Sequence, residues 1–149
     1  MGMQRLASWV RRRTDEVSAR GERGMTAIEF VVLTPVLFFM IFLTVQFGLY
    51  FFAQNIAEAA AQAGARTARA EADADPGGWR GKATRKANSY IQQLGPQLLV
   101  GPSVTTMQPE QSTVGVQVRA RVPSVFPGMD LNVTATSRGP VERFVPDGG

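Results

Sequence analysis

An uninterrupted apolar run dominates the first half of the chain. No charged residue occurs between Glu29 and Glu58, and Phe, Leu, Val and Ile fill most positions from Phe30 to Ala53. At about 1.5 Å per residue this run spans roughly 36 Å as a helix, whereas the hydrocarbon core of a bilayer is about 30 Å thick. Only a helix pairs every backbone polar group of a single segment in lipid. The run therefore predicts one transmembrane helix.

The same helix is predicted to continue beyond the apolar run. Residues 54–71 are mostly Ala, Gln, Glu and Arg, which favour helix, and Pro76 ends the pattern. Small residues recur here at intervals of four and would let another helix approach closely. The residues concerned are Ala57, Ala60, Ala61, Gly64 and Ala68. Two interpretations stay open: a packing face in an assembly, or plain alanine-rich helix propensity.

The remainder predicts a small domain of one helix and three strands. The helix covers 79–94, with Ala83, Ala87, Tyr90, Ile91 and Leu94 on one side. Alternation predicts strands at 104–107, 113–122 and 131–136, with turns at 109–112 and 127–128 and a loose tail at 138–149. Three antiparallel strands with one apolar face need a cover, which the helix can provide.

We therefore expect an α+β membrane protein with three parts. They are a basic leader at 1–24, a transmembrane and extended helix at 25–75, and a small external domain at 76–149.

Charge is concentrated in the leader and indicates orientation. The chain has 149 residues, a net charge of +4 and a pI near 10.3. Six arginines and three acidic residues fall within residues 1–24, so the rest of the chain is close to neutral. Positive charge beside a span stays on the cytoplasmic side, which predicts the N-terminus inside and the C-terminus outside. No basic stripe with interleaved aromatics occurs elsewhere, so nucleic-acid binding is not expected. A solvated tail is the preferred interpretation of the leader over a short amphipathic helix at 6–19.

The composition argues against most catalytic chemistry. The sequence contains neither cysteine nor histidine. Disulfides, Cys/His metal sites and histidine-activated nucleophiles are therefore excluded. A carboxylate or Ser–Lys site is compatible with the composition, but no spacing indicates one. We expect no enzyme activity, no catalytic residues, no metal and no cofactor.

The residues before the apolar run form a processing pattern. An ordinary signal peptide has a shorter apolar region followed by a small-x-small site, and Ala61-Gln62-Ala63 lies too far beyond this run. Before the run, Gly24 precedes Met25, and Glu29 stands at the fifth position after the glycine. Singly these residues have simpler explanations: Gly24 as a helix boundary, Glu29 as an interfacial carboxylate and Pro35 as a kink. The spacing of all three together favours prepilin processing.

Residues 24–70 resemble the TadE-like family, the pseudopilins of the Tad (tight adherence, Flp-type) pilus system. The matching elements are Gly24, the block Ala27-Ile28-Glu29-Phe30, Pro35, the pair Phe47-Gly48 and the alanine-rich stretch ending at Ala63-Gly64-Ala65-Arg66. Members of the family often carry an acidic residue before the Phe-Gly pair, where this chain has Gln46.

The resemblance implies cleavage between Gly24 and Met25 by an inner-membrane prepilin peptidase. It also implies a minor pilin or pseudopilin that contacts membrane lipid, other pilin subunits and the inner-membrane assembly platform. Glu29, Phe30 and Pro35 would serve assembly, and Glu29 would contact the new ammonium of Met25, as related pilins are thought to do between neighbouring subunits. Entry into the filament and a priming role both stay open.

Two other classes remain as alternatives. One is a single-span envelope binding protein or adhesin without a pilus role, and the other is an enzyme anchored by one helix. Neither requires a cut before the span, so the N-terminus of the mature protein separates them from the pilin.

Overall fold

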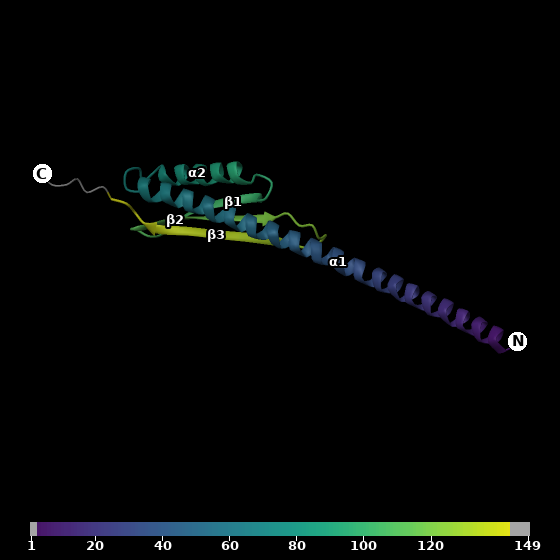
Figure 1. The fold of residues 1–149 in the computed structure, drawn as a ribbon. Helices are drawn as coiled ribbons and strands as arrows, with labels where there is room; N and C mark the ends of the chain where they lie inside the picture. The colour runs from purple at the N-terminus through teal and green to yellow at the C-terminus, as the bar shows by residue number, and fades with distance from the viewer. Residues whose placement is uncertain (1–2, 144–149) are drawn as a thin grey trace. The chain divides into compact units, whose positions relative to one another are not determined.

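The computed structural model describes the backbone of residues 3–143 and the side chains of residues 26–143. Two helices come first, α1 (Met3–Glu71) and α2 (Trp79–Leu94). Three strands follow, β1 (Val100–Glu110), β2 (Thr113–Val122) and β3 (Leu131–Pro140), as Figure 1 shows. The predicted class, a long apolar N-terminal helix followed by a helix and a three-stranded antiparallel sheet, is confirmed.

The chain divides into two compact units, Met1–Leu43 and Thr44–Gly149. The second unit therefore contains the last part of α1 as well as α2 and the sheet. We expected the external domain to start at residue 76. The predicted segment 76–149 lies inside the second unit, and α1 contributes core residues to that unit from Ala53 onward.

In the first unit the described chain is helical from Met3. Residues 3–24 are thus helix, the less favoured of the two interpretations of the leader. Leu, Ala, Arg and Glu are good helix formers, and extending an existing helix needs no new nucleus. For Gly24 and Met25 only the backbone is described, and Met1 and Gly2 lie outside the described residues.

The sheet has the order β1-β2-β3, and both pairs are antiparallel. β2 has the predicted bounds, but β1 and β3 are longer than expected. Pro109 and Glu110 belong to β1, so the turn is shorter than predicted. Residues 138–140 belong to β3 because they pair with 113–115, which corrects the predicted loose tail. The end of that tail, 144–149, lies outside the described residues. Gly128, at φ +80°, occupies the expected turn before β3.

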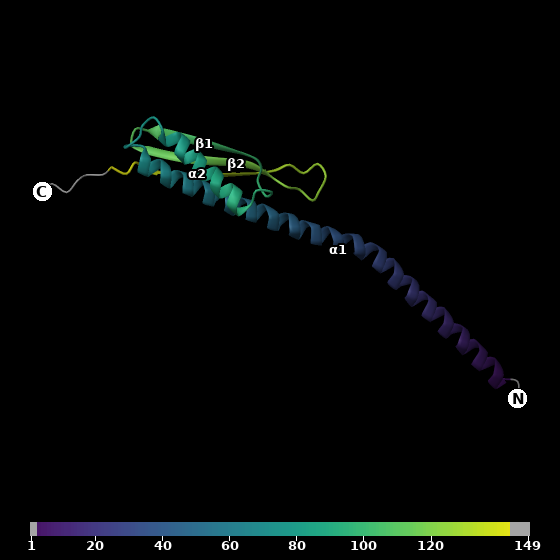
Figure 2. The same ribbon diagram turned by 90° about the horizontal axis from the view of Figure 1, so that it is seen from above.

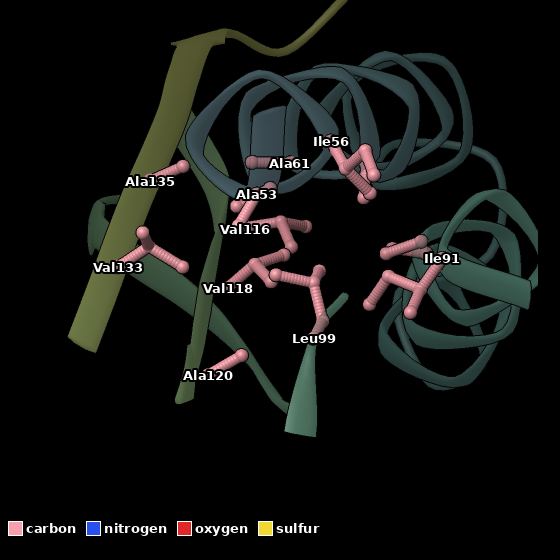
Figure 3. Packing of buried hydrophobic residues seen from close by; sticks show 14 of the residues in the cluster. Ala53, Ile56, Ala61, Ile91, Leu99, Val116, Val118, Ala120, Val133 and Ala135 are labelled. Carbon is pink, nitrogen blue, oxygen red and sulfur yellow. The ribbon is translucent and has the colours of Figure 1, made fainter. Parts of the chain in front are cut away.

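One face of the sheet is covered and the other is open. Alternate β2 residues are buried, namely Val114, Val116, Val118, Ala120 and Val122. Figure 3 shows Val116 and Val118 facing Ala53 and Ala61 of α1, with Leu99 and Ile91 at the other side of the core. The opposite face is polar, and Gln117 Nε2 donates a hydrogen bond to Thr136 Oγ1 at 3.0 Å. The core therefore lies between the sheet and both helices.

α2 has the predicted bounds and buries Trp79, Ala83, Ala87 and Ile91. Tyr90 is partly buried against this core. Leu94 was expected on the same face, but its side chain is 48% exposed. It is the last residue of the helix, and Gly95 caps the end with its N–H donated to the Ile91 carbonyl.

Candidate functional site in the N-terminal helix

The segment predicted for processing and assembly is an exposed part of α1. Residues 26–30 are exposed, including Glu29 and Phe30. Among the described residues Glu29 has no ion-pair partner within 4 Å. A carboxylate at the end of an apolar helix usually requires a partner, because charges at membrane depth pair. Glu29 is therefore available to a group from outside the described part of the chain.

Large apolar side chains surround α1 along most of its apolar run. Phe30, Val31, Leu37, Phe38 and Phe47 are all at least 50% exposed. Thr26–Glu71 is long and apolar enough to cross a membrane, and its most apolar part is not buried by other described residues. Contiguous apolar surface of this extent marks contact with a membrane or another protein.

Thr34 and Pro35 interrupt this apolar surface within one turn. Pro35 lies inside α1 and has no N–H to donate to the carbonyl one turn earlier. The Thr34 hydroxyl donates to the Phe30 carbonyl at 2.6 Å. The hydroxyl is therefore satisfied within the helix, as an apolar environment requires.

The small residues beyond the run are buried in the chain's own core. Ala57, Ala60 and Ala68 are 0% exposed and Ala61 is 1% exposed. A Cβ at Gly64 would lie 3.1 Å from the Ala83 carbonyl oxygen and from Ala87 Cβ, and 3.2 Å from Val116 Cγ2. This small-residue face packs against α2 and the sheet of the same chain. The spacing of the small residues did not reveal which element packs on them, because small residues permit close approach by any helix or strand.

Gln46, which the sequence marks as a departure from the acidic residue common in the TadE-like family, is a further functional candidate. Its side chain is 3% exposed and is the only polar side chain that is buried among the described residues. Its Nε2 donates to the Pro123 carbonyl at 3.3 Å, and its Oε1 accepts from the Val125 N–H at 2.8 Å. A carboxylate could accept from Val125 but has no proton for Pro123. The signal in the sequence was a lone amide in an apolar run.

An ion cluster joins the end of α1 to the start of α2. Lys82 Nζ lies 2.7 Å from Glu71 Oε2 and 3.2 Å from Asp75 Oδ2. Hydrogen bonds to Glu71 and then to Asp75 raise the pKa of Lys82. The hydrogen bond from Lys82, followed by that from the Gly78 N–H, lowers the pKa of Asp75. These groups are substantially exposed, so their contribution is screened by solvent.

A sequence model of the family described as TadE-like protein matches residues 24–66. The N-terminal helix carries a TadE-like segment. The match begins at Gly24, the glycine of the processing pattern, and confirms the resemblance seen in the sequence. No curated protein and no solved structure matches the chain.

The TadE-like segment contains both exposed and buried candidate residues. It includes the exposed Glu29 and Phe30, the buried amide Gln46 and the buried Gly64. α2 and all three strands lie outside the match.

Proposed function

We propose that the protein is a minor pilin or pseudopilin that takes part in assembling a Tad-type pilus. The observation that carries this proposal is the TadE-like match, which begins at Gly24 and covers the whole apolar run. In this proposal α1 crosses the inner membrane once. The arginine-rich leader stays in the cytoplasm, and α2 and the sheet lie outside.

The exposed apolar surface of α1 supports this proposal. In lipid the side chains from Phe30 to Phe52 need no protein cover, and in a pilus the same surface would pack against helices of other subunits. The partners proposed are membrane lipid, other pilin subunits, a prepilin peptidase and the inner-membrane assembly platform. We propose no enzymatic role, since the chain lacks the histidine and cysteine of common nucleophilic and metal sites.

A membrane-anchored binding protein is the second candidate. It is favoured by the end of the match at residue 66, which leaves α2 and the sheet without a family assignment. Such a protein would need the same anchor but no cut after Gly24. Processing therefore separates the two functions.

The test is N-terminal sequencing of protein extracted from membranes that contain a prepilin peptidase. The pilin proposal expects Met25 as the first residue of the mature chain. Gly24→Phe should leave the full-length chain, because a bulky side chain before the scissile bond would not fit the peptidase. Gly21→Phe is the matched control, since it places the same side chain three residues earlier, and it should still be processed. A full-length wild-type chain, or a normally shortened Gly24→Phe chain, would contradict the assignment.

A further inference from the structure

We propose that the loop between β2 and β3, residues 123–130, is a membrane-contacting loop held at its depth by Gln46. This inference rests on the proposed membrane anchoring of α1. Its partner is the outer leaflet of the bilayer that α1 crosses. The loop extends from the end of the sheet in Figure 2.

The loop is apolar and keeps large side chains exposed. Its sequence is Pro-Ser-Val-Phe-Pro-Gly-Met-Asp, with Asp130 as its single charge. Val125 is 39% exposed and Met129 is 40% exposed. A loop of a water-soluble surface would ordinarily be polar, so these side chains indicate an apolar partner.

The depth of Gln46 places this loop at the membrane boundary. If the hydrocarbon core begins at Phe30, its ~30 Å thickness ends about 20 residues later, near Leu49. Gln46 lies inside that limit and bonds directly to Pro123 and Val125. Its helix neighbours Val45 and Phe47 remain 46% and 65% exposed, so the loop covers only one side of α1 there.

The exposed apolar residues of the domain gather at one end. Outside α1, the large hydrophobic side chains exposed among the described residues are Leu94, Val100, Val125 and Met129. α2 ends at Leu94, β1 begins at Val100, and the loop joins the end of β2 to the start of β3. In an antiparallel sheet these strand ends lie together. The same end contacts α1, since a Cβ at Gly95 would meet the side chain of Ile56.

The opposite end of the domain is charged. It contains the Lys82 cluster with Glu71 and Asp75, and the pair Arg69–Glu142. The domain is therefore polarised along the strands, with the apolar side chains at the end where the loop bonds to Gln46.

The backbone of the loop is also suited to a low-dielectric boundary. Pro123 and Pro127 have no N–H, and the Val125 N–H donates to Gln46. The Phe126 N–H donates to Ser124 Oγ at 3.1 Å, and the Met129 N–H donates to the Phe126 carbonyl at 3.4 Å. These internal bonds reduce the number of donors that would lose water on contact with lipid.

The test uses the full-length protein in phosphatidylcholine vesicles. Because the chain has no cysteine, single cysteines can be introduced and labelled with an environment-sensitive fluorophore. Val125→Cys and Met129→Cys probe the loop, and Ser112→Cys in the turn at the opposite end is the control. Lipid carrying a doxyl quencher should cause a loss of fluorescence at 125 and 129 but not at 112. Equal quenching at all three positions would overturn the proposal.

Two further variants separate the parts of the argument. Leu37→Cys reports insertion of α1, and a label there that is not quenched would overturn the membrane anchoring and this inference with it. Quenching at 37 without quenching at 125 and 129 would overturn the loop contact alone. The same holds if the labels at 125 and 129 leave water only when other pilin subunits are present. Gln46→Leu, which is similar in size but makes neither hydrogen bond, should reduce quenching at 125, whereas Gln54→Leu, which loses only a hydrogen bond to Glu58, should not. Unchanged quenching in Gln46→Leu would contradict the anchoring role of this amide.

Discussion

The two stretches of α1 place large and small side chains in opposite environments. From Ile28 to Phe52 the exposed large hydrophobic residues are between 45 and 71% exposed. From Ala53 to Ala68 the buried residues are alanines, Ile56 and Gly64, and the alanines are at most 8% exposed. Side-chain size along α1 therefore indicates what each stretch packs against. Bulky residues suit lipid or another subunit, whereas small residues allow the chain's own sheet and second helix to approach closely.

The largest effect should come from removing the small-residue stretch. A fragment of residues 76–149 leaves Val116 and Val118 without the cover that α1 provides. Burying a side chain of this size contributes about 1.5–3 kcal/mol, a large part of the stability of a small domain. We expect no cooperative unfolding transition for 76–149 and a clear one for 53–149, as followed by circular dichroism during heating. Equal midpoints would contradict the place of α1 in the core.

Gly48 and Gly64, both within the TadE-like segment, offer a matched comparison of the two stretches. Gly64→Leu would force a side chain against Ala83, Ala87 and Val116, whereas a Cβ at Gly48 meets nothing within 4 Å. Overpacking of this kind costs about 1–3 kcal/mol. Chemical denaturation of the protein in detergent should show this loss for Gly64→Leu and little change for Gly48→Leu. Similar losses of stability in both variants would contradict the view that the first stretch is exposed and the second is packed in the core.

The smallest effect concerns the ion cluster at the end of α1. The pKa of Asp75 is lowered in the folded protein, so its contribution is present at neutral pH and is lost as the pH falls through that pKa. The pKa of Lys82 is raised, so its contribution is lost only as the pH rises through that pKa. Melting temperatures measured against pH should therefore decline less steeply at both extremes in Lys82→Met than in wild type. Arg85→Met, an exposed cation on the same helix, should keep the wild-type profile.

Much of this architecture was predictable because it depends on local patterns. The charge-free run, the alternation in β2 and the bounds of α2 follow from periodicity and from breakers such as Gly95 and Pro96. The lengths of β1 and β3 could not be predicted in this way, because pairing with β2 extends these strands through residues such as Pro109 and Gly139. The partner of Gly64 and the two hydrogen bonds of Gln46 join residues far apart in sequence. Periodicity within one segment carries no information about such contacts.

We propose that the exposed stretch of α1 is a processed pilin helix that joins other subunits. Cleavage after Gly24 would create an ammonium on Met25, four residues before the exposed Glu29. That ammonium could pair with Glu29 of a neighbouring subunit, and a carboxylate near membrane depth requires such a partner.

The most direct measurement is crosslinking of Glu29→Ala to pilin partners in cells that contain the pilus system, with cleavage followed in parallel. We expect Glu29→Ala to reach the membrane but to lose its crosslinks to other subunits. Glu58→Ala, which removes an exposed carboxylate from the other stretch of the same helix, should retain them. Wild-type crosslinking by Glu29→Ala would contradict the claim and would leave Glu29 as an interfacial anchor.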